Sequence, residues 1–135
     1  METEEISVAR LMVTETITVS TDTVVEDAAQ KLRERDIGSL MIVDEDNQLK
    51  GILTATDFVK IVAKSNPKAE TPVERYMSED VITVGPTDTI ADSATLMLDN
   101  DIQHLPVTDP EEGLIGMLSS TDLTMYLSDN ALSGS

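Results

Sequence analysis

Apolar and polar positions along this chain alternate first with the two-residue period of a strand and then with the period of a helix. The β-branched run Thr16–Val19 predicts a strand. The stretch after it predicts an amphipathic helix. The apolar face of this helix carries Val25, Ala28, Ala29 and Leu32. Thr23 followed by Glu26 has the spacing of a capping box at the helix start, and Thr89 followed by Asp92 repeats this spacing.

Two more strands and a second helix complete the pattern. Strands are predicted at Leu40–Val43 and Leu49–Thr54, and the polar segment Asp44–Asn47 between them is typical of a hairpin loop. The next helix is predicted to start around Thr56-Asp57. The order of elements is therefore β-α-β-β-α.

This order occurs twice, because a shift of 65 residues aligns the two halves of the chain without a gap. Pairs of identical residues include Val8 and Val73, Arg10 and Arg75, Met12 and Met77, Ile17-Thr18-Val19 and Ile82-Thr83-Val84, Gly51 and Gly116, and Thr56-Asp57 and Thr121-Asp122. We expect repeat 1 at residues 1–64, a linker at 65–72 and repeat 2 at 73–135.

One β-α-β-β-α unit has too few strands and too little apolar area to fold comfortably alone. The sequence therefore predicts an α+β fold in which two such repeats pack through their sheets with pseudo-twofold symmetry. Ligand sites favour junctions of this kind, so we expect a site in the cleft between the repeats.

The charge of the chain narrows the choice of partners. It has 26 acidic against 9 basic residues and a net charge of −17. Such a surface repels phosphate backbones and anionic lipid, which argues against nucleic acid and membrane partners. The acidity is typical either of an ordinary soluble acidic protein or of a protein from a host with high internal salt, such as a halophilic archaeon, and composition alone leaves both open.

Several functions are disfavoured by what the sequence lacks. It has no cysteine, no apolar run long enough to cross a bilayer and no secretory signal, so we expect a cytoplasmic protein. His104 is the single histidine, which gives no support for a metal site. No nucleophile–base pair and no Walker-type loop are present, so we expect no catalytic residues and no enzyme activity.

Three motifs give the chain a family resemblance. They are the leading Leu11-Met12 with Ile17-Thr18-Val19, the strand segment Ile102–Val107, and the twice-used pattern of Gly, two apolar residues, Thr or Ser, two variable residues and Asp, at Gly51–Asp57 and Gly116–Asp122. Together they resemble a tandem pair of CBS (cystathionine β-synthase) domains, also called a Bateman module. The resemblance covers about Val8 to Leu127.

The resemblance implies a regulatory module that binds an adenosine-containing ligand, either AMP, ADP or ATP or S-adenosylmethionine. Asp57 and Asp122 would hold the ribose hydroxyls. The other implied ligand-binding residues are Thr54, Thr56, Ser119 and Thr121 at the ribose and phosphate end, Ile37, Gly38, Ser39, Ile102, Gln103 and His104 near base and phosphate, and Thr16, Ile17, Val81 and Ile82 at the adenine edge. We expect each site to combine the Asp motif of one repeat, Gly51–Asp57 or Gly116–Asp122, with the strand segments of the other repeat.

Thr56 and Thr121 depart from the family pattern, in which Arg often precedes the final Asp and meets phosphate. This departure weakens ATP relative to AMP and leaves room for the cationic S-adenosylmethionine. Bound Mg²⁺ or high salt could compensate for the missing cation.

Other interpretations remain open at this point. Asp57 and Asp122 could serve only as acidic residues at a helix start. The module could be a dimerisation or partner-docking scaffold without a ligand, or a divalent-cation sensor that uses its acidic loops. The resemblance also implies a homodimer, and a regulated protein that the sequence does not identify.

Overall fold

The computed structural model describes residues 6–35, 38–64 and 71–134. The chain forms two compact units: unit 1 contains residues 1–16 and 82–135, and unit 2 contains residues 17–81. We describe each unit by itself.

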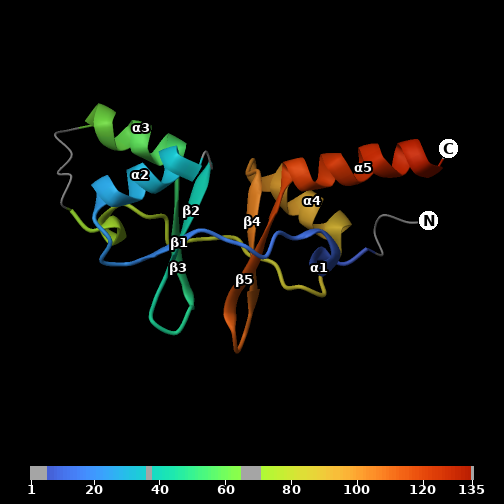
Figure 1. Ribbon diagram of the computed structural model, residues 1–135, viewed down its shortest axis with the longest axis horizontal. Helices are drawn as coiled ribbons and strands as arrows, with labels where there is room; N and C mark the ends of the chain where they lie inside the picture. The colour runs from blue at the N-terminus through green and yellow to red at the C-terminus, as the bar shows by residue number, and fades with distance from the viewer. Residues whose placement is uncertain (1–5, 36–37, 65–70, 135) are drawn as a thin grey trace. The chain divides into compact units, whose positions relative to one another are not determined.

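Unit 2 is built on a three-stranded sheet in the order β1-β2-β3. β1 (Thr18–Ser20) runs parallel to β2 (Ser39–Val43), and β2 pairs antiparallel with β3 (Leu49–Thr54). Helices α2 (Val25–Arg35) and α3 (Ala55–Lys64) lie on one side of this sheet (Figure 1). A short 3₁₀ helix, η2 (Val73–Arg75), closes the unit.

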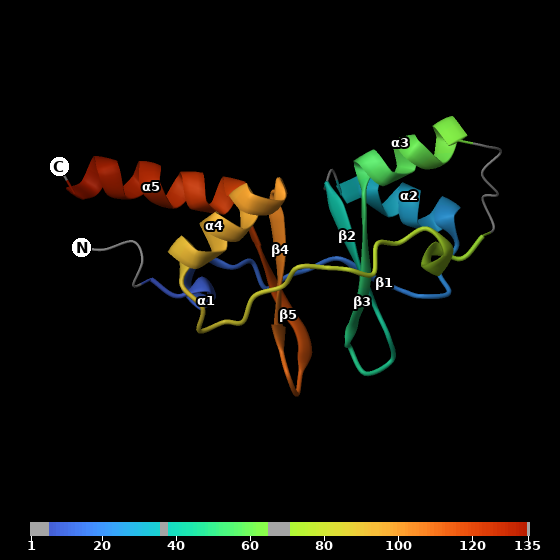
Figure 2. The same ribbon diagram turned by 180° about the vertical axis from the view of Figure 1, so that it is seen from behind.

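Unit 1 repeats this plan with a smaller regular sheet. β4 (His104–Asp109) pairs antiparallel with β5 (Gly113–Ser119), and a parallel bridge joins Val84 to Val107 where unit 2 has its β1–β2 pairing. Helices α4 (Ile90–Asn100) and α5 (Ser120–Gly134) lie on one side of the pair, and α1 (Val8–Leu11) belongs to the same unit (Figure 2).

The leading segments of the two repeats are exchanged between the units. In unit 1, Val13 forms an antiparallel bridge with Met117 of β5. In unit 2, Ser78 forms the equivalent bridge with Ile52 of β3. Each compact unit therefore contains the leading segment of one sequence repeat and the strands of the other. The sequence repeats and the compact units are thus divided differently, and domain boundaries at 1–64, 65–72 and 73–135 stay a prediction.

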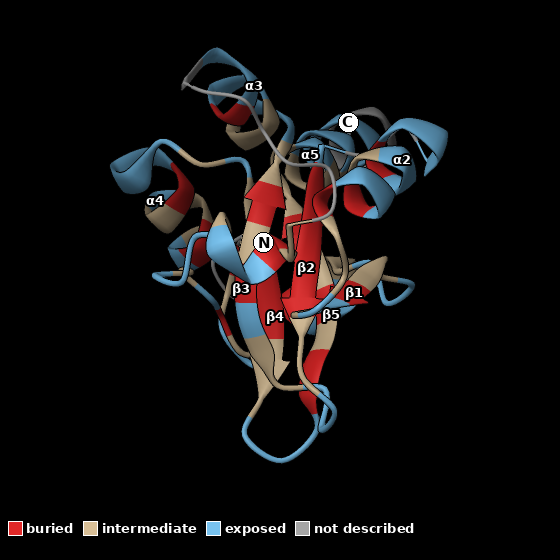
Figure 3. Ribbon diagram, turned by 90° about the vertical axis from the view of Figure 1, so that its left-hand side faces the viewer, coloured by how far each residue is buried: buried red, intermediate tan, exposed pale blue. Residues whose placement is uncertain are grey.

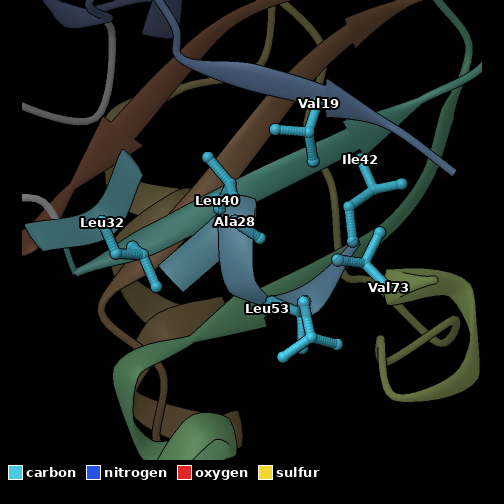
Figure 4. Packing of buried hydrophobic residues seen from close by; sticks show 8 residues of the cluster. Val19, Ala28, Leu32, Leu40, Ile42, Leu53 and Val73 are labelled. Carbon is cyan, nitrogen blue, oxygen red and sulfur yellow. The ribbon is translucent and has the colours of Figure 1, made fainter. Parts of the chain in front are cut away.

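Each unit has its own apolar core. In unit 2 the core joins one face of α2 to the sheet, and the sticks in Figure 4 show its residues. They are Val19, Val25, Ala28, Leu32, Leu40, Ile42, Leu53 and Val73. The core of unit 1 consists of Val8, Val84, Met97, Leu105, Val107 and Leu118. In Figure 3 the buried residues include most of β2 in unit 2 and part of β4 in unit 1, as expected for strands covered by amphipathic helices.

The repeated glycines allow close packing of the exchanged segments. An added Cβ on Gly51 would lie 2.5 Å from Met77 Sδ, and one on Gly116 would lie 2.8 Å from Met12 Sδ. The repeat-matched methionines Met77 and Met12 therefore pack directly against strand positions without side chains.

The local predictions are confirmed with small shifts and one error. The mixed α and β fold and the two copies of the unit are confirmed, and β3 has the predicted bounds. Thr89 caps α4, since its Oγ1 accepts the Asp92 N–H at 3.1 Å. The capping box predicted at Thr23 is wrong, because α2 starts at Val25 and the Thr23 hydroxyl accepts the Ser20 N–H at 3.2 Å.

Candidate functional site

Asp57 lies at the junction between β3 and α3, in the first turn of the helix. Its Oδ2 accepts the Thr54 backbone N–H at 2.8 Å and the Thr54 hydroxyl at 3.1 Å. The Thr54 Oγ1 in turn accepts the Asp57 N–H at 3.3 Å. This reciprocal pair is a capping box, so the motif both starts α3 and fixes the orientation of the carboxylate.

Asp122 has the same arrangement between β5 and α5. Its Oδ2 accepts the Ser119 N–H at 2.8 Å, and the Ser119 Oγ accepts the Asp122 N–H at 3.2 Å. The helix-start role that sequence reasoning left open is therefore real at both positions. It is a role in local structure that ligand contact can share.

The capping boxes use only one oxygen of each carboxylate. Both Asp57 and Asp122 are half-buried, and Oδ2 is the acceptor in every hydrogen bond that the described residues give them. The second oxygen, Oδ1, thus keeps its capacity to accept. A fixed carboxylate beside a helix N-terminus can accept hydrogen bonds from a vicinal diol, while the helix dipole favours an anion nearby.

The strand segments before β2 and β4 lie beside these motifs within the same unit. The Ala55 N–H donates to the Gly38 carbonyl at 3.2 Å, and the Ser120 N–H donates to the Gln103 carbonyl at 3.0 Å. Across the strands, Ser39 is opposite Thr54 and His104 is opposite Ser119. Each unit therefore gathers an Asp motif and the strand segment of the same repeat.

His104 has the most distinctive environment in the motif of unit 1. Its ring is half-buried, and this burial lowers the pKa of the imidazole below its ordinary value, while the negative charge of Asp122 opposes the shift. The net direction of the pKa shift is down, so the environment favours the neutral imidazole.

The remaining predicted site residues are less closely tied to the Asp motifs. Ile37 lies outside the described residues. The side chains of Thr56 and Thr121 are exposed in the first turns of α3 and α5. Ile102, Ile17 and Ile82 pack against the two cores, and Thr16 and Val81 stand at the ends of units 1 and 2. Among the described residues, no hydrogen bond links these last five residues to Asp57 or Asp122, and the cross-repeat site stays a prediction.

The backbone hydrogen bonds from Ala55 to Gly38 and from Ser120 to Gln103 are the part of the site that the sequence did not predict. These residues follow the strand directly and precede the Asp by two positions. A small residue at the first position of a helix gave no chemical signal, because the hydrogen bond is made by its main chain.

Acidic groups are abundant, but the described residues include no cluster of three or more His, Asp or Glu side chains placed to hold a metal ion. In that same part of the chain, no helix has the length and apolar character that a bilayer crossing requires.

A family model described as CBS domain matches the chain twice, at residues 8–64 and 73–129. The two matches correspond to the two copies found from the sequence.

Among curated relatives, an uncharacterized 17.7 kDa protein of Acidianus ambivalens is 34% identical over 90% of this chain and 73% of its own length. The CBS domain-containing protein YhcV of Bacillus subtilis is 30% identical over 96% of this chain and 91% of its own. A homoserine O-acetyltransferase of Methanosalsum zhilinae is 33% identical over 93% of this chain, which spans only 25% of that enzyme.

Solved structures give the same result. The CBS domain pair of protein MJ0100, in complex with 5′-methylthioadenosine and S-adenosyl-L-methionine, has a TM-score of 0.82 at 27% identity and covers 92% of this chain and 97% of its own. The cytosolic domain of the Mg²⁺ channel MgtE, in complex with ATP, has a TM-score of 0.77 at 30% identity over 91% of this chain and 49% of its own.

Proposed function

This chain belongs to the CBS domain family, and from that premise we propose that it is a regulatory module that binds an adenosine-containing ligand. The ligand classes are AMP, ADP or ATP and S-adenosylmethionine. Binding changes the conformation or the oligomeric state of the module, and this change is passed to another protein or domain.

The observation that carries the proposal is the duplicated capping box. In both motifs a Thr or Ser fixes Oδ2 of an aspartate and leaves Oδ1 able to accept hydrogen bonds. In both motifs the same helix start also donates a backbone hydrogen bond to the strand segment, so the fixed carboxylate and this segment lie together. The ligands in the structure of the MJ0100 pair, which has the same fold, add support for an adenosine group.

The charge of the chain favours ligands with few phosphates or with a cation. Thr56 and Thr121 bring no cation to the starts of α3 and α5, and the net charge of the chain is −17. AMP and S-adenosylmethionine therefore fit better than ATP, whose phosphates would need Mg²⁺ or high salt to offset repulsion.

The proposal describes a binding module without catalysis of its own. The similarity to the homoserine O-acetyltransferase of Methanosalsum zhilinae covers only 25% of the length of that enzyme. A module of this kind controls whatever protein or domain it contacts.

We also propose that the module forms a homodimer. The support is a set of large apolar side chains that are exposed on the helices following the Asp motifs. These are Val59 and Val62 on α3, and Met125 and Leu127 on α5, which are between 57% and 69% exposed. Apolar surface of this kind is commonly covered in an oligomer.

Isothermal titration calorimetry of the full chain with AMP, ATP and S-adenosylmethionine in molar KCl tests the binding proposal. The variants are Asp57→Asn and Asp122→Asn, which keep an oxygen for the cap but remove the charge. A lost hydrogen bond to a charged group costs about 1.5–3 kcal/mol, so affinity at the affected motif should fall about 10- to 100-fold.

Thr89→Ala is the matched control, because it removes a helix cap of the same type from α4. It should lower the melting temperature without changing ligand affinity. No heat and no thermal shift with any of the three ligands would contradict the proposal and favour a scaffold without ligand.

A further inference from the structure

The two Asp motifs differ chemically at one position of the strand segment. Repeat 1 has Ser39 there, which is 3% exposed, and repeat 2 has His104, which is half-buried. Both residues face their motif in the same way, because Ser39 is opposite Thr54 and His104 is opposite Ser119 in an antiparallel pair. Residues directly opposite each other share one face of the sheet. The motif of unit 1 therefore has a titratable group that the motif of unit 2 lacks.

The hydrogen bonds of unit 1 hold this group beside the carboxylate. The Ser119 N–H donates to Asp122 Oδ2 at 2.8 Å, and the Ser120 N–H donates to the carbonyl of Gln103, the residue before His104, at 3.0 Å. The start of β4 and the start of α5 are thus fixed against each other. The charge of Asp122 acts on the imidazole, as expected from this geometry.

Cations are almost absent from unit 1. Arg10 is the single Lys or Arg in residues 1–16 and 82–135, and its side chain is exposed on α1. β5 carries no ionisable side chain, β4 carries Asp109 at its other end besides His104 itself, and α4 ends at exposed acids that include Asp99. A phosphate placed at this motif would meet Asp122 and further acidic groups. Among the described residues of unit 1, His104 is the side chain at this motif that can become a cation.

We propose that a phosphate-bearing adenosine ligand binds the motif formed by His104, Ser119 and Asp122 together with one proton from solvent, which His104 takes up. This inference rests on the proposed function. The imidazolium would lie between two anions and donate to both, so it removes a repulsion that a neutral ring leaves in place. The motif with Ser39 cannot take up a proton in this way, so the two motifs differ in their response to pH and in their selectivity for phosphate.

Calorimetry with AMP in an Asp57→Asn background isolates the motif of unit 1. Titrations at several pH values, each in two buffers of different ionisation enthalpy, count the protons taken up. We expect net proton uptake and an affinity that rises by up to about tenfold for each unit of falling pH over the range where His104 titrates. 5′-Methylthioadenosine, which carries no phosphate, should bind with no proton uptake.

The variant His104→Gln should abolish the proton uptake for AMP and leave 5′-methylthioadenosine binding unchanged. Because this variant could also disturb the fold, NMR titration of the single histidine in the unmodified chain gives a second readout. Its midpoint should rise when AMP is added. AMP binding with no proton uptake and an unmoved midpoint would overturn the inference alone, whereas failure of every adenosine ligand to bind at any pH would overturn the proposed function as well.

Discussion

Gly51 and Gly116 occupy the same position in the two repeats, yet the structure predicts different costs for adding a methyl group. An ideal Cβ on Gly51 would lie 2.5 Å from Met77 Sδ and 2.7 Å from Met77 Cγ, and the three nearest atoms all belong to that flexible residue. A Cβ on Gly116 would lie 2.8 Å from Met12 Sδ and also 2.9 Å from the Val13 carbonyl oxygen. One contact can be relieved by a side chain, while the other involves the main chain.

The magnitude follows from these contacts. Non-bonded carbon atoms normally stay about 3.5–4.0 Å apart, so both substitutions create an overlap of about 1 Å. Overpacking that a side chain can relieve costs about 1–3 kcal/mol, which we expect for Gly51→Ala. At Gly116 the Val13 oxygen also accepts the Met117 N–H at 2.9 Å, and the Val13 N–H donates to the Met117 oxygen at 2.8 Å. Moving this segment weakens both bonds and adds about 0.5–1.5 kcal/mol for each.

Urea unfolding of a double-mutant cycle measures the difference. Met77→Ala should recover most of the stability lost in Gly51→Ala, because it removes Sδ and Cγ, the two atoms that lie nearest to the new methyl group. Met12→Ala should recover only part of the loss in Gly116→Ala, because the Val13 oxygen stays in place. The reasoning is refuted if Gly116→Ala is no more destabilising than Gly51→Ala and Met12→Ala restores it fully.

Three further predictions follow from other parts of the molecule. A fragment of residues 17–81 should show a more cooperative thermal transition by circular dichroism than a fragment of residues 1–64, because the fragment 1–64 lacks Val73, which is buried in the core of unit 2. Equal transitions in the two fragments would contradict the exchange of leading segments. Hydrogen bonds from the Gln48 and Asp46 N–H groups lower the pKa of Asp44, and its ion pair with Lys50 acts in the same direction. The pKa of Asp44 in the folded state lies below its pKa in the unfolded state, so this stabilisation is present above about pH 4 and is lost as pH falls through the folded pKa. The loss of stability caused by Asp44→Ala in thermal melts should therefore shrink toward acidic pH. A loss of stability that is constant with pH would argue against this role of Asp44. Burial lowers the pKa of His104, so the unfolded state binds more protons than the folded state below about pH 6.5. The ligand-free chain should therefore lose stability relative to the His104→Gln variant as pH falls below that value, and thermal melts across pH measure this difference.

Much of the candidate site could be predicted from the sequence because its parts are local. Thr54 and Asp57 are three residues apart at a change from strand to helix period, and the capping box forms between those same residues. The same pattern at Ser119 and Asp122 forms the same capping box. The ligand contacts at these residues remain predictions.

The error at Thr23 shows the limit of local spacing. The pattern Thr-x-x-Glu was present, but the Thr23 hydroxyl accepts the Ser20 N–H of the preceding turn, and the helix begins one residue later than the pattern implied. Local hydrogen bonds of a hydroxyl compete with one another, and the sequence gives no ranking between them.

The sequence by itself determined the elements, their order and their duplication, because hydrophobic period and helix caps depend on residues a few positions apart. Only the tertiary structure decided which leading segment completes which core. Val8 and Val73 occupy the same position in the two repeats and have the same apolar character, so pattern alone fits either residue to either core. The choice depends on contacts between residues far apart in the chain, as does the burial of His104 beside Asp122, and such contacts leave no periodic trace in the sequence.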